Sequence, residues 1–167
     1  MLIDDLQHPG YLSCLGTRWE SVTDRVMGGL SDAALARETY QGRSCLHLRG
    51  DVRLDNNGGF VQMALDLAPL GGELDASSWT GVELVVQGNG ERYGVHLRTG
   101  DLTRPWQSYR AGLVAGPAWQ TVRLPFVDFV PHRTEAPLAL QRLRRLGLVA
   151  IGRAFEADLR LACLSFY

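Results

Sequence analysis

Apolar and polar residues alternate along much of this 167-residue chain, in one short segment after another. A period of two residues is typical of strands that are buried on one face. In residues 46–54 the pattern predicts an apolar and a polar face: Leu46, Leu48, Val52 and Leu54 against His47, Arg49, Asp51 and Arg53. Further strands are predicted at 61–67, 82–86, 93–98, 108–114, 121–124, 146–150 and 159–164.

Only residues 138–146 could form a helix longer than one turn. Many short strands without intervening helices are typical of an antiparallel β-sandwich or barrel. No internal repeat, low-complexity tract or flexible linker divides the chain, so we expect one all-β domain over residues 1–167. Its predicted core contains Leu48, Val52, Met63, Leu65, Leu84, Val95, Leu97, Val122, Leu124, Leu148 and Leu161.

Two Gly-Gly turns interrupt the alternation, one in Val22–Ser31 and one in Asn56–Phe60. Glycine beside Asp or Asn favours a turn in which φ is positive. The second turn, and likewise Gly88-Asn89-Gly90, is interpreted as a hairpin connection. We expect the two Gly-Gly turns to lie together at one end or edge of the sandwich, held by Asp24 and Asn57.

Two interpretations of these turns remain open. They are folding devices, in which the Asp and Asn side chains fix the loops through backbone hydrogen bonds. Alternatively they form a recognition site, from which Arg25, Met27 and Phe60 project outward to bind a partner. The sequence favours the folding device, because such loops need side-chain support wherever they occur.

The charge pattern narrows the possible partners. The chain has 17 basic and 18 acidic residues, and they are interspersed, so no segment is typical of a nucleic-acid arm or a polybasic membrane patch. Every basic residue among the 17 is arginine, since the sequence contains no lysine. Schiff-base amines, pyridoxal-phosphate anchors and P-loop lysines are therefore excluded.

The N-terminus and the cysteines indicate the compartment. Asp4 and Asp5 stand where a signal peptide would carry positive charge, and no apolar run is long enough to cross a bilayer. We expect a cytoplasmic protein with at most peripheral membrane contact through a partner. Cys14, Cys45 and Cys163 are odd in number and widely spaced, which predicts free, mostly buried thiols.

No pattern in the sequence supports catalysis. The chain has no Gly-x-Ser-x-Gly motif and no cysteine in a protease context. Its four histidines are far apart and none pairs with another at metal-ligand spacing, although His47 and His96 could converge if their strands are neighbours. The acidic residues mostly fall in predicted turns. We therefore expect no catalytic residue, no metal and no cofactor.

Basic side chains on the polar faces of the predicted strands are more informative: His47, Arg49, Arg53, Arg92, His96, Arg98, Arg110 and Arg123. If several share one sheet, they could bind carboxylate, phosphate or an acidic protein surface through planar guanidinium groups. The favoured alternative is an ordinary solvated surface. Among the tryptophans, Trp106 lies in a predicted loop and is the candidate for an exposed sugar-stacking ring, with core packing as the alternative.

Several segments together resemble a known family. Trp19 and Val22–Ser31 are followed in order by Asn57–Phe60, residues 79–84 and 88–93, Tyr109, residues 119–129 and 146–148. This series resembles the signature of the complex I intermediate-associated protein 30 family over nearly the whole chain. The resemblance implies a galactose-binding-like β-jelly roll. It also implies a non-enzymatic role, because the namesake of the family acts as a chaperone in the assembly of respiratory complex I.

Two function hypotheses follow. The first is an assembly factor that presents Met27 and Phe60 to a protein partner, such as a respiratory-chain assembly intermediate. The alternative is a small-molecule or carbohydrate-binding module. The candidate binding residues are Asp24, Arg25, Met27, Gly28, Gly29, Ser31, Asn57, Gly58, Gly59, Phe60, His96, Arg98 and Trp106.

Overall fold

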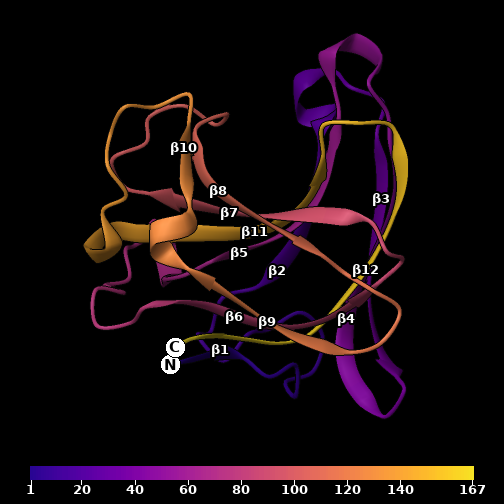
Figure 1. The fold of residues 1–167 in the computed structure, drawn as a ribbon, viewed down its shortest axis with the longest axis horizontal. Helices are drawn as coiled ribbons and strands as arrows, with labels where there is room; N and C mark the ends of the chain where they lie inside the picture. Colours follow the sequence, from indigo (N-terminus) through magenta and orange to yellow (C-terminus); the bar gives the residue numbers. More distant parts are fainter.

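The computed structural model describes residues 1–167 as two antiparallel β-sheets packed face to face, which confirms the all-β sandwich (Figure 1). Sheet 1 has the order β3 (Asp32–Tyr40), β4 (Arg43–Val52), β12 (Phe155–Phe166), β6 (Gly81–Gly88) and β9 (Gln120–Pro125), with β1 (Leu2–Asp4) paired to β12. Sheet 2 has the order β10 (Val130–His132), β8 (Ser108–Val114), β7 (Arg92–Thr99), β11 (Leu143–Ile151), β5 (Phe60–Asp66) and β2 (Trp19–Thr23).

Many of the connections cross from one sheet to the other. Strands β4 and β5 belong to different sheets, and so do β6 and β7, so the hairpins predicted at residues 56–59 and at Gly88-Asn89-Gly90 are wrong. Turn residues indicate where a chain reverses but carry no information on which strands then pair. A two-residue hairpin does join β3 and β4, where Gln41 and Gly42 both have the positive φ of a type I′ turn.

The core lies between the two sheets and matches the predicted alternation closely. Every predicted core residue is buried except Val122, which is half-buried on the edge strand β9. One face assignment is wrong, because β4 ends at Val52 and Leu54 is 51% exposed. His47 lies on the polar face as predicted, but it is buried there between Glu38 and Asp158.

The helix expected at residues 138–146 is also wrong. A single 3-10 turn, η5 (Leu140–Arg142), leads directly into β11. Strand β11 is central in sheet 2, where β5 and β7 supply its backbone partners on both sides. These pairings outweigh the helix propensity of the leucine and arginine residues. No helix in the structure is long and apolar enough to cross a membrane.

Candidate functional site

The two Gly-Gly turns meet at the buried carboxylate of Asp24, which begins the 3-10 turn η1 (Asp24–Met27). Its Oδ1 accepts a hydrogen bond from the Ser31 amide at 3.0 Å, and its Oδ2 accepts one from the Phe60 amide at 3.1 Å. The Ser31 hydroxyl and the Gly59 amide also donate to Oδ2. A single carboxylate therefore joins two turns that are 35 residues apart, as expected.

The glycines of both turns are required by the same carboxylate. A Cβ on Gly29 would lie 2.4 Å from the Asp24 Cγ, and a Cβ on Gly58 would lie 2.6 Å from the Asp24 Oδ2. The other glycine of each turn, Gly28 or Gly59, has positive φ. Each Gly-Gly pair thus combines a left-handed or otherwise unusual backbone with close packing on a charged group.

Burial would raise the pKa of Asp24, but the hydrogen bonds from Ser31, Gly59 and Phe60 outweigh burial and hold the pKa below its ordinary value. The predicted role of Asn57 is wrong, because its side chain makes no hydrogen bond. Asn56 instead donates to the Gly28 carbonyl at 3.3 Å. The turns are therefore centred on one carboxylate, which supports the folding-device interpretation for the residues that touch it.

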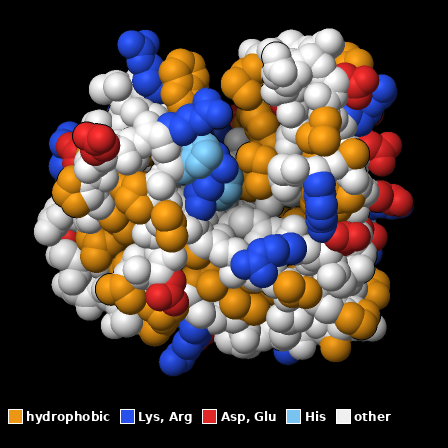
Figure 2. All heavy atoms as spheres, turned by 45° about the horizontal axis from the view of Figure 1, so that its top comes forward, with side chains coloured by type: hydrophobic (Ala, Val, Ile, Leu, Met, Phe, Trp, Pro, Cys, Tyr) orange, Lys and Arg blue, Asp and Glu red, His pale blue; other side chains and the backbone are white.

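A groove of about 1050 Å³ lies over the outer face of sheet 2. Strands β5, β11, β7 and β8 form its floor, η1 and the second Gly-Gly turn lie at one end, and the 105–108 and 132–133 segments lie at the other. Figure 2 shows the hollow between two lobes, with arginine and histidine side chains inside it. The candidate residues that line it are Met27, Asn57, Gly58, Gly59, Phe60, His96, Arg98 and Trp106.

The remaining candidates lie outside the groove. Asp24, Gly29 and Ser31 are buried in the junction of the turns. Arg25 is exposed and donates from Nε to the Ser31 carbonyl at 2.9 Å, so it braces the turn. Gly28 is also exposed but does not line the groove. The structure thus separates a supporting set of residues from a groove-lining set.

The groove is lined by basic residues and by no acidic residue. The full set of basic residues is His96, Arg98, Arg110, His132, Arg133 and Arg145. His132, Arg133 and Arg145 lie outside the strands that the alternation predicts, so the sequence does not mark them. Register brings them together, since His96 lies opposite Arg110 and Arg98 lies opposite Arg145. Arg145 is neutralised by Asp66 and Glu20, at 2.6 and 2.5 Å.

Neighbouring positive charge and burial affect how the groove residues titrate. Burial lowers the pKa of His96 to about 3, and the charges of Arg110 and His132 add to this effect. Burial and the charges of Arg110 and Arg133 lower the pKa of His132. Burial and neighbouring arginines also lower the pKa values of Arg98 and Arg110. Both histidines are therefore neutral at pH 7, whereas the arginines stay charged.

Arg98 fixes the loop that carries Trp106. Its Nη1 donates to the carbonyl oxygens of Arg104, Pro105 and Gln107, at 2.9, 3.0 and 2.6 Å. The Trp106 ring is 46% exposed, and the other tryptophans are buried or half-buried. Arg98 thus positions an exposed aromatic ring at the edge of the groove.

The basic residues of sheet 1 have a different environment. His47 lies between two carboxylates, with Nδ1 3.0 Å from the Glu38 Oε1 and Nε2 2.6 Å from the Asp158 Oδ1. Arg160 pairs with the same Glu38 oxygen at 2.6 Å. The suggested convergence of His47 with His96 is wrong, because β4 and β7 belong to different sheets.

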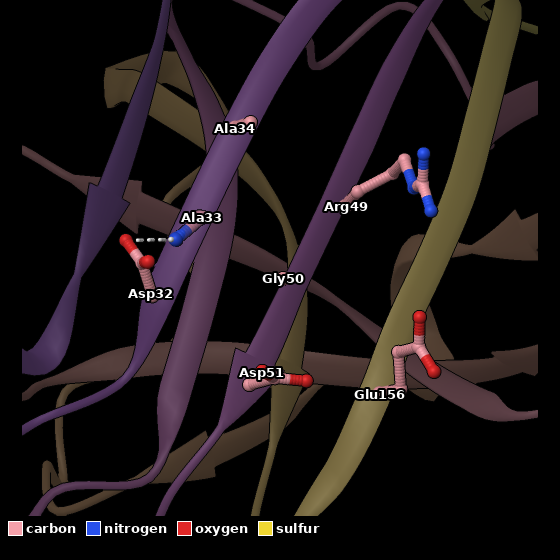
Figure 3. A pocket seen from close by; sticks show the side chains of 7 residues that line it. All are labelled: Asp32, Ala33, Ala34, Arg49, Gly50, Asp51 and Glu156. Carbon is pink, nitrogen blue, oxygen red and sulfur yellow. Dashed lines mark hydrogen bonds between the residues drawn. The ribbon is translucent and has the colours of Figure 1, made fainter.

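A smaller hollow of about 320 Å³ lies beside β3, β4 and β12 of sheet 1. Figure 3 shows Arg49 and Glu156 on neighbouring strands, with Asp32 turned back onto the Ala33 amide. The lining carries Asp32, Asp51 and Glu156 as well as Arg49, so both signs of charge are present. This open, mixed surface is a weaker candidate than the groove.

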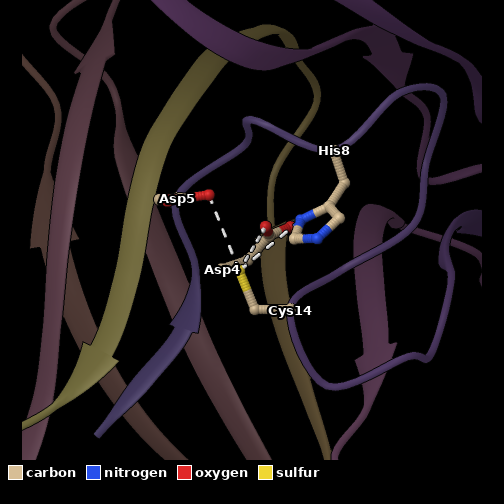
Figure 4. A group of neighbouring side chains, drawn as sticks. All are labelled: Asp4, Asp5, His8 and Cys14. Carbon is tan, nitrogen blue, oxygen red and sulfur yellow. Dashed lines mark hydrogen bonds between the residues drawn. The ribbon is translucent and has the colours of Figure 1, made fainter.

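A cluster near the N-terminus contains four side chains that are able to bind metals, Asp4, Asp5, His8 and Cys14 (Figure 4). The Cys14 Sγ lies 3.6–3.7 Å from an oxygen of each carboxylate and from the His8 Nδ1. Burial raises the pKa of the Cys14 thiol, and the two carboxylates add to the rise. Asp4 accepts hydrogen bonds from the Leu6 amide and the Trp19 indole, at 3.0 and 2.7 Å, which ties β1 to β2.

Comparison with known proteins adds a family and a fold. Residues 13–162 match the family model described as complex I intermediate-associated protein 30. No curated protein has a sequence that matches this chain significantly.

Solved structures with a similar fold include carbohydrate-binding modules. The family 11 module of the Clostridium thermocellum cellulase Lic26A-Cel5E superposes with a TM-score of 0.76 at 11% identity, covering 99% of this chain and 92% of that chain. The family 30 module of Cel9D-Cel44B from the same organism gives 0.64 at 15% identity, with 88% and 90% covered. These likenesses confirm the galactose-binding-like jelly roll and, at such identities, show the fold alone.

Proposed function

The chain belongs to the complex I intermediate-associated protein 30 family, and we propose that it is a non-catalytic assembly factor whose groove on sheet 2 holds a segment of a partner protein. One observation carries the proposal: the groove combines exposed apolar side chains at both ends with a polar, basic floor. Such a mixture of apolar and polar groups is typical of transient protein interfaces.

The apolar groups lie on opposite edges of sheet 2. Val26 and Met27 follow β2 and are 73% and 53% exposed, while Phe60 begins the adjacent strand β5. Trp106 precedes β8 near the other edge. Flexible methionine and rigid tryptophan are side-chain types that contribute strongly to protein recognition. A bound segment that crosses the strands would contact both edges.

Site-specific photo-crosslinking tests this proposal. We expect a benzophenone amino acid in place of Val26 to crosslink one partner in native lysate, and the same amino acid in place of Leu70 to leave it unlinked. Leu70 is fully exposed and does not line the groove, so it is a matched control. Mass spectrometry that identifies a respiratory-chain assembly subunit supports the proposal, whereas equal crosslinking from both positions contradicts it.

Carbohydrate binding is the second candidate, because one exposed indole lies on the groove of a fold shared with carbohydrate-binding modules. Aromatic rings stack on the apolar faces of sugars. Calorimetry with a mixed-linked β-glucan tetrasaccharide separates the candidates. Saturable binding that Trp106→Ala abolishes would favour the carbohydrate candidate over a partner protein.

A further inference from the structure

The groove concentrates positive charge in a chain whose net charge is −1. Of its four arginines, only Arg145 forms a salt bridge. The Arg110 Nε donates to the Ser108 hydroxyl at 2.8 Å, and Arg98 donates to three backbone carbonyls. Arg133 makes no side-chain hydrogen bond or ion pair. Three guanidinium groups therefore share the groove without any carboxylate to neutralise them.

This arrangement is unfavourable while the groove is empty. Arg98 and Arg110 are half-buried, and water screens partly buried charges less than exposed ones. Arg110 also faces His96 across the strand pair, and its charge lowers the pKa of both His96 and His132. A ligand that brings negative charge to Arg110 and Arg133 relieves this repulsion and gains charge-assisted hydrogen bonds.

We propose that the groove recognises carboxylates, and that its occupant is an acidic segment of the partner protein. This inference rests on the proposed function and names the chemistry of its partner. Arg110 and Arg133 are the residues that bind the carboxylates, because their terminal guanidinium nitrogens have no partner in the protein. Arg98 is a positioning residue, since its Nη1 holds the Trp106 loop.

The shape and chemistry of the groove favour a peptide over an acidic glycan. Val26, Met27, Val149 and Ile151 line it beside the arginines, and aliphatic or thioether groups complement apolar side chains rather than sugar rings. Trp106 is the single tryptophan in the lining. A segment in which acidic and apolar residues are mixed satisfies both the basic floor and these apolar ends.

Three synthetic 12-residue peptides test the inference by fluorescence anisotropy with the full chain. They share the same leucine and serine positions and carry Glu, Gln or Lys at the remaining ones. We expect the Glu peptide to bind about tenfold more tightly than the Gln peptide, and the Lys peptide not to bind. The affinity of the Glu peptide should fall as the NaCl concentration rises from about 0.05 to 0.5 M.

Arginine variants locate the binding. We expect Arg110→Gln to lower the affinity for the Glu peptide about five- to tenfold, and Arg110→Lys to lower it less. Arg49→Gln on sheet 1 should leave this affinity unchanged. Equal affinities for the Glu and Gln peptides, an unchanged Arg110→Gln variant, or binding of oligogalacturonate alone would overturn the inference. A groove-specific crosslink to a segment without acidic residues would overturn it and leave the proposed function intact. Binding of the Glu peptide without any groove-specific crosslink would support the carboxylate inference and contradict the proposed function.

Discussion

The outer faces of the two sheets carry similar basic residues in opposite electrostatic settings. On sheet 1, His47 and Arg160 share Glu38 and Asp158, and Arg123 pairs with Glu83 at 2.7 Å. On sheet 2, the groove holds His96, Arg98, Arg110, His132 and Arg133 with no carboxylate partner. The same residue types are therefore used in two ways within one sandwich.

The difference shows what the two faces contribute. Charges with partners in the folded chain satisfy their hydrogen bonds and stabilise the fold, because losing one partner leaves the other desolvated. Arginines without a carboxylate partner, such as Arg110 and Arg133, contribute little to the stability of the free protein, and their terminal nitrogens remain available to a ligand. Substituting a charge that has a partner should therefore lower the free energy of unfolding of the protein. Substituting a groove arginine without a carboxylate partner should change the free energy of unfolding little, but should alter binding.

Removing the most completely partnered charge should have the largest effect. Asp24→Ala leaves the buried amides of Ser31, Gly59 and Phe60 without an acceptor, so we expect the free energy of unfolding to fall by about 3 kcal/mol or more. Urea denaturation followed by tryptophan fluorescence measures the loss. Asp128→Ala, at an exposed carboxylate in another turn, is the control. Equal free energies of unfolding for Asp24→Ala and Asp128→Ala would contradict the role of Asp24 in holding the two turns.

A second, smaller loss is expected on sheet 1. His47→Ala leaves Glu38 and Asp158 with Arg160 as their only cation, and it opens a space where the buried ring had been. We expect the free energy of unfolding to fall by about 2 kcal/mol. The thermal unfolding midpoint, compared with that of His8→Ala at an exposed site, measures it. A His47→Ala midpoint no lower than that of His8→Ala would mean that the network does not stabilise the fold.

The sheets could be predicted from the alternation, except at their edges. Strand β3 was missed because its alanines, Ala33, Ala34 and Ala36, give a weak strand signal and an edge strand buries little of either face. Strands β1 and β10 have three residues each, which is too short for a period to emerge. Local pattern therefore predicted the strands with large apolar residues and left out most of those at the margins.

The candidate site could be predicted only in part. The Gly-Gly turns and Trp106 have local signals, namely turn residues and an aromatic residue in a polar loop. Whether an arginine has a partner depends on strand pairing across the sandwich, since Arg160 and Glu38 lie 122 residues apart. Alternation placed basic residues on polar faces but did not distinguish the paired surface of sheet 1 from the groove of sheet 2.

As the pH falls below 7, the free energy of unfolding should first decrease because of His96 in the groove, at pH values where the carboxylates are still ionised. His96 has its pKa lowered from 6.5 to about 3, so between these values the unfolded chain binds more protons than the folded chain. The free energy of unfolding therefore falls as pH decreases from 7 to 5. His96→Gln should reduce this slope in urea titrations across that range. An unaltered slope in His96→Gln would show that the groove does not lower the pKa of His96.

The smallest expected effect is the sharpest test, because its sign differs between the two faces. Arg110→Gln removes a half-buried cation that repels its neighbours, so we expect the free energy of unfolding to rise by about 0.5 kcal/mol. Arg160→Gln on sheet 1 removes one of the two partners of Glu38, so we expect a fall of about 1 kcal/mol. Both variants exchange the same side chains on the outward face of a strand, and urea denaturation at pH 7 and low salt compares them directly. Added salt should shrink the gain in Arg110→Gln, since screening already relieves the repulsion. A loss of stability in both variants would mean that the hydrogen bond from Arg110 to Ser108 outweighs the repulsion, and that the two faces do not differ in kind.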